Sequence, residues 1–575
     1  MVIVRTLAPA LLATGLLAGG LDAQATGRVP TDWRFPLHPP AVTARHAIVV
    51  SDAPLATAAG VQVLRAGGNA VDAAIATAFA LAVVYPEAGN LGGGGFMLAR
   101  LPDGTTAALD FRERAPAAAT PDMYLDSLGQ LTDGSLIGGR ASGVPGTVMG
   151  LWEAHRRLGR RPWASLLAPA MRLAERGFVV DAHLHASLAH ARERLAPFPA
   201  TAALLYPGGR VPATGSRLRH PELARTLRRI AREGAKGFYQ GGTAGLIARA
   251  LAANGGLVTR ADLAAYRAVW RDPVAFTYRG CRVIAMPPPS SGGLTLALIA
   301  RILEGWDLGA LGWHSPEALH LTAEAMRRAF AERNAFLGDP DFVSIPSDHF
   351  LSDPYVARLR ATIDPLRATP STAVRAGLPT LSATHTTHLG VIDAHGGAVA
   401  LTTTLNDLYG SAVTIAGAGF LMNDEMDDFT NRPGTPNMYG LVQGAANAIA
   451  PGKRPLSAMT PIIVLDSADR PLLVTGARGG PRIISAVYQV LSNVLDFGMD
   501  VGSAVAAPRI HQQHLPDTLY YEPGGFTPAL LDSLRARGQT LAPMNGIGNA
   551  PSILRRGEVW TAYPDPRSGG AAQGF

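Results

Sequence analysis

The chain of 575 residues contains one cysteine, Cys281, so no disulfide can form within it. It has two lysines, Lys236 and Lys453, and nearly all of its 51 basic residues are therefore arginines. Charged residues make up 17% and hydrophobic residues 47%, which excludes global disorder. Nothing beside Cys281 marks it as a nucleophile, and we expect a buried, inert thiol.

The formal net charge of +7 is scattered along the chain except for one arginine-rich segment, residues 217–236. No aromatic residues alternate with these arginines, whereas a nucleic-acid site would combine both. We therefore expect a solvated helix face and no nucleic-acid partner.

Long apolar segments are also missing. Arg5 and the short apolar run 7–18 precede Ala23-Gln24-Ala25, a pattern typical of a signal peptide over residues 1–25. We expect cleavage after Ala25, export to a periplasm or beyond, and no stable membrane anchor; an uncleaved anchor is the alternative. The segment 71–84 is too short to span a bilayer and predicts a core helix.

Residues 26–45 are rich in proline and polar residues, and we expect a tether. The rest of the chain alternates strand-like apolar segments with alanine-rich helical ones, typical of a mixed α/β protein. Ser315 as N-cap and Pro316 at the first position predict a helix that ends before Gly338. Residues 361–385 have no sustained period, which indicates an exposed loop.

Two β-prone segments follow that loop at once. Residues 386–393 and 398–404 are joined by the glycine-containing turn 395–397, which predicts a hairpin. A linker that ends abruptly at a strand beginning with threonine is typical of a cleavage site inside a precursor. We therefore expect the chain to be cut between His385 and Thr386.

Such a cut would turn Thr386 into a nucleophile. An N-terminal threonine carries an α-amine that titrates near about 8 and can accept the proton of its own hydroxyl. In the cleavage step the Thr386 hydroxyl would attack the carbonyl of His385 and form an ester that water hydrolyses. On this pattern alone, a purely structural pair of threonines remains the simpler interpretation.

Eight short motifs in a fixed order change that interpretation. They are Asn90–Met97, Leu109–Glu113, Pro287–Gly293, Thr386–His388, Thr404–Asn406, Met426–Phe429, Lys453–Ser457 and Gly479-Gly480. In this order they resemble the γ-glutamyltranspeptidase family, from about residue 46 to the C-terminus. Each motif is weak alone, but the ordered set is specific.

The resemblance implies an N-terminal-nucleophile hydrolase of the α/β (α+β) class, a four-layer αββα sandwich. Residues 26–385 would form a large fragment and residues 386–575 a small one, held together as an obligate heterodimer. At about 150 residues per domain the length predicts three to four domains. The motifs instead indicate one composite domain, cut once.

The resemblance also implies the chemistry. In such proteins the threonine attacks a γ-glutamyl amide and forms an ester that passes to water or to an acceptor amine. Matched motif by motif, Thr386 is the nucleophile and Thr404 the hydroxyl that orients it. Gly479 and Gly480 match the backbone N–H pair of the oxyanion hole, where glycine allows close approach.

Substrate recognition follows from charge. Arg112 is suited to a bidentate contact with the α-carboxylate of a γ-glutamyl group, and Ser457 adds a hydroxyl. Asn406, Glu425 and Asp428 match the family positions around the α-ammonium. Without the resemblance, a surface ion pair would be the expected role of Arg112.

One position departs from the family pattern. Many members have a second serine where this chain has Ala458, and the missing hydroxyl could cost about 1–2 kcal/mol in binding. Residues 433–439 resemble a lid loop in which Tyr439 shields the glutamyl pocket. An ordinary surface turn is the alternative for this loop.

Other patterns predict no cofactor. The glycines 92–95 lack the lysine of a phosphate-binding loop. Five of the 15 histidines lie in two sequence groups, which are His183, His185 and His190, and His511 and His514. The first group does not match zinc spacing, so we expect exposed helical histidines, and the second group suggests structural roles. We expect neither a metal nor an organic cofactor.

The sequence therefore predicts an exported, self-processing γ-glutamyltransferase and hydrolase of glutathione-like compounds, with amino acids or peptides as acceptors. One alternative is an acylase that removes a glutaryl side chain from β-lactam-type amides. Its substrate lacks the α-ammonium and would not need Asn406, Glu425 and Asp428. The other alternative, an unprocessed periplasmic binding protein, is disfavoured by the intact Thr386 and Thr404.

Overall fold

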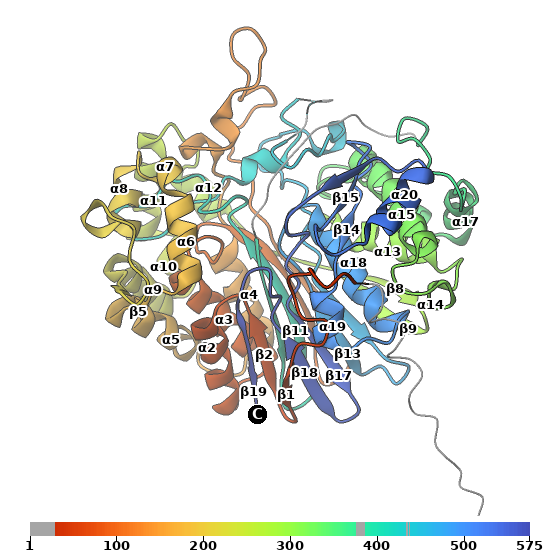
Figure 1. Cartoon of the computed structure of the whole chain (residues 1–575). Coiled ribbons are helices and arrows are strands. Elements are labelled where there is room, and N and C mark those ends of the chain that lie inside the picture. Colours follow the sequence, from red (N-terminus) through yellow and green to blue (C-terminus); the bar gives the residue numbers. More distant parts are fainter. Residues whose placement is uncertain (1–28, 375–385, 433–434, 436) are drawn as a thin grey trace, which may run out of the picture.

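The computed structural model describes residues 29–374, 386–432, 435 and 437–575. Two seven-stranded sheets lie face to face, and helices cover the outer face of each sheet (Figure 1). This confirms the predicted four-layer αββα sandwich. The predicted signal peptide and His385 lie outside the described residues. Within the described part of the chain, no helix is both long and apolar enough to cross a bilayer.

The first sheet carries the predicted hairpin at its centre. Its strands, in spatial order, are β19 (Ala571–Gly574), β2 (Ile48–Ser51), β10 (Thr386–Ile392), β11 (Ala398–Thr404), β3 (Gly94–Arg100), β4 (Thr106–Phe111) and β7 (Val269–Arg271). Neighbouring strands are antiparallel, and β10 and β11 pair over their full length. Every residue of both strands is buried, because helices cover one face and the second sheet the other.

The second sheet packs on the first. Its strands, in spatial order, are β1 (Val42–Ala44), β18 (Val559–Tyr563), β17 (Ser552–Arg556), β13 (Pro471–Thr475), β12 (Ile462–Leu465), β9 (Cys281–Ala285) and β8 (Val274–Tyr278). One apolar cluster fills the space between the two sheets and continues under the helices on this side.

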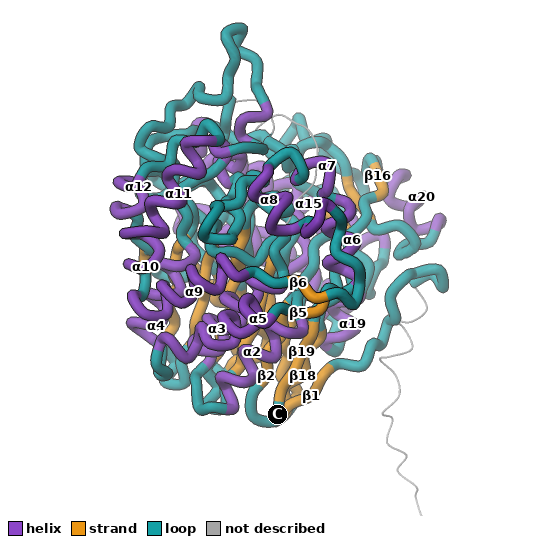
Figure 2. Tube along the Cα trace, turned by 90° about the vertical axis from the view of Figure 1, so that its left-hand side faces the viewer, coloured by secondary structure: helices purple, strands orange, loops and turns teal. Residues whose placement is uncertain are grey.

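The helices outside the first sheet begin with α2 (Pro54–Arg65) and α3 (Ala70–Val84), and Figure 2 shows them from outside. All residues of α3 are buried, which confirms the predicted core helix. Others on this side are α4 (Thr147–Leu158), α5 (Trp163–Arg176), α6 (Ala182–His190), α7 (Arg192–Leu195), α8 (Pro199–Leu205), α9 (Pro221–Glu233), α10 (Lys236–Tyr239), α11 (Gly241–Ala253) and α12 (Arg260–Ala265). In α9, Leu227 and Ile230 are buried whereas Arg225 and Arg228 are exposed, which confirms the predicted solvated face.

The helices on the side of the second sheet include α15 (Pro316–Phe336), which begins as predicted: the Ser315 hydroxyl accepts a hydrogen bond from the Ala318 N–H at 3.1 Å. The others are α13 (Gly292–Leu303), α14 (Leu308–Leu311), α16 (Ser347–Phe350), α17 (Asp353–Ala361), α18 (Arg482–Leu495), α19 (Val501–Ala506) and α20 (Pro528–Ala536). Two small sheets complete the fold, β5 (Phe178–Val179) with β6 (Arg217–Leu218), and β14 (Ile510–His511) with β15 (Leu519–Tyr521) and β16 (Leu541–Pro543).

The prediction of a tether over residues 26–45 is wrong for its described part. Trp33 is buried, and its indole N–H donates to the Ala506 carbonyl at 3.2 Å. Val42–Ala44 forms strand β1 and pairs with β18. The segment is proline-rich, but the burial of Trp33 and Ala44 and the pairing of β1 with β18 fix it on the body.

Candidate active site

One pocket of about 300 Å³ collects nearly all of the predicted site residues. It is lined by Arg112, Arg333, Thr386, Thr404, Asn406, Glu425, Asp428, Tyr439, Leu441, Ser457, Ala458, Met459, Gly480, Pro481 and Ile483. Of the other two predicted residues, Gly479 directly precedes Gly480, and His385 lies outside the described residues. The lining comes from segments on both sides of residue 385, so the tertiary fold assembles the pocket.

The two threonines meet at the open end of the β10–β11 hairpin. Thr386 and Thr404 are paired in register, and their hydroxyl oxygens lie 3.3 Å apart. The Thr404 oxygen also accepts a hydrogen bond from the Asn406 N–H at 2.9 Å. Both threonines are buried, so the pair is shielded from bulk water and fixed by its strands.

The two glycines lie between strand β13 and helix α18. Their φ angles of 132° and 53° lie in the region that favours glycine, so a side chain at either position would strain the turn. The Gly480 carbonyl accepts the Ile483 N–H at 2.9 Å, which ties the turn to the start of α18. Gly480 therefore reaches the wall of the pocket beside Thr386.

Arg112 is completely buried and faces three carboxylates. Its Nη1 contacts Glu425 and its Nη2 contacts Asp428, and Glu113 lies 3.4 Å from Nη1. Its Nε donates to the Pro455 carbonyl at 3.1 Å. Arg112 thus lies in a buried ion cluster, which rules out the surface ion pair expected without the resemblance.

The cluster sets three carboxyl groups against the one guanidinium of Arg112. Burial raises the pKa of Glu425 well above its usual range and raises that of Glu113, although the Arg112 charge opposes both shifts. Burial alone would lower the pKa of Arg112, but Glu425 and Asp428 outweigh it and raise that pKa. A further cation in this pocket would therefore be stabilised.

Asn406 links the threonine pair to the segment that carries Asp424, Glu425 and Asp428. Its backbone has φ of 79°, and its side-chain amide donates to the Asp424 carbonyl at 3.0 Å. Its side-chain oxygen accepts a hydrogen bond from the Tyr439 hydroxyl. Tyr439 is buried at the pocket wall, whereas residues 433, 434 and 436 of the predicted lid loop lie outside the described residues.

Ser457 and Ala458 line the same pocket next to Met459. Ser457 is held from both sides, because its N–H donates to Pro289 at 2.8 Å and its carbonyl accepts from the Ser291 N–H at 2.7 Å. Its hydroxyl oxygen accepts the Met459 N–H at 3.1 Å. The proline- and glycine-rich motif 287–293 therefore shapes the wall that carries Ser457.

Sequence reasoning missed two charged residues of the site. Arg333 on α15 lines the pocket, is fully buried and donates through Nε to the Ser291 hydroxyl at 2.9 Å; burial lowers its pKa to about 10. Glu113 belongs to the motif Leu109–Glu113, but the sequence indicated it only as a possible surface ion-pair partner of Arg112. Only its adjacency to Arg112 could have pointed to it, and nothing local singled out Arg333.

Among the described residues, no group of three or more His, Cys, Asp or Glu side chains is arranged to hold a metal ion. The prediction of exposed histidines holds for His190, whereas His183 and His185 are half-buried, and the His183 Nε2 lies 3.0 Å from a Glu87 oxygen. His511 and His514 are buried and hydrogen-bonded, in agreement with structural roles. Cys281 is half-buried on β9 and not fully buried as expected, and burial raises its pKa.

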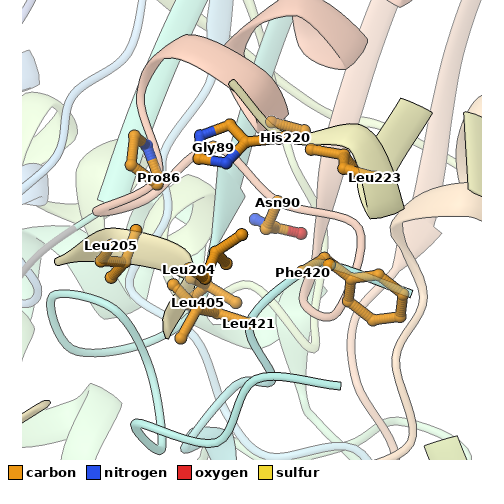
Figure 3. A pocket seen from close by; sticks show the side chains of 12 residues that line it. Pro86, Gly89, Asn90, Leu204, Leu205, His220, Leu223, Leu405, Phe420 and Leu421 are labelled. Atoms are coloured by element: carbon orange, nitrogen blue, oxygen red, sulfur yellow. The ribbon is translucent and has the colours of Figure 1, made fainter. Parts of the chain in front are cut away.

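A second pocket, of about 330 Å³, contains neither threonine of the pair (Figure 3). Leucines from α8, α9 and the segment after β11 line it together with Phe420 and His220. Burial lowers the pKa of His220 to about 4, so the ring is neutral at physiological pH. Asn90 reaches this pocket too, and its side chain contacts the Thr404 carbonyl.

Comparisons with known proteins agree with this geometry. The family model described as gamma-glutamyltranspeptidase matches residues 56–575. The glutathione hydrolase proenzyme of Pseudomonas sp. (strain A14) is 42% identical and covers 99% of this chain and 100% of its own. That of Escherichia coli (strain K12) is 45% identical over 92% of both chains.

Among solved structures, the cephalosporin acylase from Bacillus halodurans superimposes with a TM-score of 0.82 at 28% identity, covering 95% of this chain and 99% of that one. The fold is thus shared with an acylase, and the acylase ACY 1 proenzyme of Pseudomonas sp. (strain SE83) is also 40% identical over 80% of this chain and 82% of its own. With its family model matched over nearly its whole length and close relatives aligned from end to end, the chain belongs to the gamma-glutamyltranspeptidase family of enzymes.

Proposed function

We propose that the protein is an exported, self-processing γ-glutamyltransferase and glutathione hydrolase. The Thr386 hydroxyl attacks the γ-glutamyl amide, the amine leaves, and a γ-glutamyl ester remains on Thr386. Water or the amine of an acceptor amino acid or peptide then takes the γ-glutamyl group. One observation carries this proposal: a buried ion cluster with surplus carboxylates lies in the same pocket as the threonine pair.

A γ-glutamyl group brings one carboxylate and one ammonium to this cluster. Its carboxylate would pair with Arg112 and contact Ser457, and its ammonium would contact Glu425, Asp428 and Asn406. The buried carboxylates outnumber the guanidinium that they contact. The ammonium would therefore lie beside carboxyl groups whose charged form it stabilises.

The catalytic groups would act as follows. After cleavage, the free α-amine of Thr386 accepts the proton of its hydroxyl, and the Thr404 hydroxyl orients that oxygen. The amides of Gly479 and Gly480 stabilise the tetrahedral oxyanion. Tyr439 shields the ester from bulk water on the side of Asn406.

The same cluster argues against a glutaryl side-chain acylase. A glutaryl amide carries a carboxylate but no ammonium, so it would bring further negative charge into a site where carboxylates are already in excess. Desolvating an unpaired charge is costly. A γ-glutamyl amide fits the cluster better.

The sheet composition supports a two-fragment enzyme. Strands β2, β3, β4 and β7 of the first sheet precede residue 385, and β10, β11 and β19 follow it. The second sheet is mixed in the same way. Fragments 26–385 and 386–575 would therefore share both sheets and remain an obligate heterodimer without any disulfide.

Two measurements test the proposal. On a denaturing gel the 60.0 kDa chain should give fragments of about 38 and about 20 kDa, and a single uncut band would contradict self-processing. Release of p-nitroaniline from γ-glutamyl-p-nitroanilide, with and without glycylglycine, separates transfer from hydrolysis. No release under either condition would contradict the γ-glutamyl assignment.

A further inference from the structure

The segment from Tyr85 to Asn90, directly after α3, contacts the β10–β11 hairpin that carries Thr386 and Thr404. The Asn90 side-chain amide donates to the Thr404 carbonyl at 2.8 Å and to the Thr403 hydroxyl at 3.1 Å. Figure 3 shows Pro86, Gly89 and Asn90 together along this segment. The segment therefore fixes the end of β11 from the side away from Thr386's own strand.

Glu87, in the middle of this segment, is a buried carboxylate that the proposed reaction does not use. One of its oxygens lies 3.0 Å from Arg478 Nη1 and 3.0 Å from His183 Nε2. The other accepts a hydrogen bond from the Ser187 hydroxyl. Its main-chain carbonyl accepts the Tyr409 N–H at 3.0 Å, so both the carboxylate and the backbone of Glu87 are fixed.

Arg478 directly precedes the two glycines of the pocket. Its main chain exchanges two hydrogen bonds with Asn549, at 2.9 and 3.0 Å, and its guanidinium also contacts the Tyr85 hydroxyl. Asn549 in turn donates to Asp52 at 2.7 Å, and Asp52 accepts the Thr387 hydroxyl at 2.7 Å. A continuous polar network therefore joins the residue after Thr386 to the residue before Gly479.

Glycines need such anchors because they adopt many backbone conformations at similar energy. Helix α18 anchors the pair on its C-terminal side. On the N-terminal side the anchor is Arg478, whose side chain is held by the Glu87 carboxylate. If Arg478 shifted, the direction of the glycine N–H groups would change with it.

We propose that Glu87 is a positioning residue, which holds Arg478 and thereby aims the Gly479 and Gly480 amides at the oxyanion formed on attack by Thr386. This inference rests on the proposed function, in which those amides stabilise the transition state. Glu87 itself does not touch the substrate.

The ion pair depends on a charged Glu87. Burial would raise its pKa, but the hydrogen bond from His183 and the charges of Arg478 and His183 outweigh burial and hold that pKa far below its usual range. Glu87→Gln keeps the size of the side chain and removes the charge that holds Arg478.

The test uses Glu87→Gln, Arg478→Met, their double variant and Arg478→Lys. For γ-glutamyl-p-nitroanilide we expect the first two to lower kcat about 10- to 100-fold with KM within about 3-fold, because oxyanion contacts act only in the transition state. The kcat of the double variant should be about as low as that of either single variant, because each substitution breaks the same Glu87–Arg478 contact. Arg478→Lys, which keeps the positive charge, should have a kcat much closer to the wild type than Arg478→Met. Rates are expressed per cleaved enzyme, counted on a gel.

Asp496→Asn is the matched control. Asp496 is a buried partner of Arg279 at 2.6 Å and lies just past the end of α18 opposite the glycines, about 20 Å away by helix rise. It should lower the melting temperature and leave kcat unchanged. A wild-type kcat in Glu87→Gln and Arg478→Met, or an equal kcat loss in Asp496→Asn, would overturn the inference alone. A wild-type protein without γ-glutamyl activity would overturn the proposed function and the inference together.

Discussion

The hydroxyl oxygens of Thr386 and Thr404 lie 3.3 Å apart because the two residues are register partners across the hairpin. Thr404→Val keeps the shape of the side chain and removes the hydroxyl that we propose orients the Thr386 nucleophile. We expect kcat to fall about 10-fold, as for the loss of one hydrogen bond of about 1–2 kcal/mol. Thr404→Ser should stay close to the wild type, and an undiminished kcat in Thr404→Val would contradict the orienting role.

Thr386→Ala removes the proposed nucleophile. It should remain a single band on a denaturing gel and release no p-nitroaniline, because both cleavage and turnover need the hydroxyl. Thr386→Ser, which keeps a hydroxyl, should cleave and turn over at a reduced rate. Cleavage of the alanine variant at this junction would show that another group performs it.

Asp428→Asn changes which substrate the pocket prefers. It removes one carboxylate from the proposed ammonium site, so KM for γ-glutamyl-p-nitroanilide should rise about 10-fold or more. KM for glutaryl-p-nitroanilide, which has no ammonium, should change little or fall. Equal changes for the two anilides would mean that Asp428 does not face the ammonium.

Ala458→Ser adds a hydroxyl at the pocket wall beside Ser457. A hydrogen bond to a carboxylate worth about 1–2 kcal/mol would lower KM about 5- to 30-fold. Activity assays over a range of γ-glutamyl-p-nitroanilide concentrations measure this directly. An unchanged KM would show that position 458 does not reach the α-carboxylate.

His183 makes stability depend on pH. The hydrogen bond to Glu87 raises the His183 pKa above its usual value of 6.5, against the effects of burial and of Arg478; Asp181 adds a small increase, and the Tyr85 ring stacks on the imidazole. Because the pKa of His183 is higher in the folded protein than in the unfolded chain, its protonation stabilises the folded state. This contribution is fully present below about pH 6 and is lost as the pH rises through the pKa of the folded state.

The variant His183→Gln should therefore melt below the wild type at about pH 5.5, and the difference should shrink towards about pH 9. Thermal melts of both proteins across this range provide the measurement. A difference that is constant with pH would mean that the charge of His183 does not contribute.

Local patterns in the sequence determined several elements without the fold. The start of α15 follows from Ser315 and Pro316, whose cap and fixed φ act within one turn. The β10–β11 hairpin follows from two β-prone segments around a glycine turn. The ordered motifs indicated the family, because each is a short run of adjacent residues that can be recognised from the sequence alone.

Only the tertiary structure decided how charges combine. Arg112 meets Glu425 and Asp428 across more than 300 residues of chain, and no local signal predicts that contact or the excess of carboxylates around it. The same holds for Arg333, and for the half-buried His183, which pairs with the buried Glu87. Residues 29–45 likewise pack on the body, because the surface that buries Trp33 comes from the distant helix α19 and its neighbours. Short-range steric contacts and hydrogen bonds depend on residues that are neighbours in the sequence. Burial and the pairing of charges depend on which distant segments the core brings together.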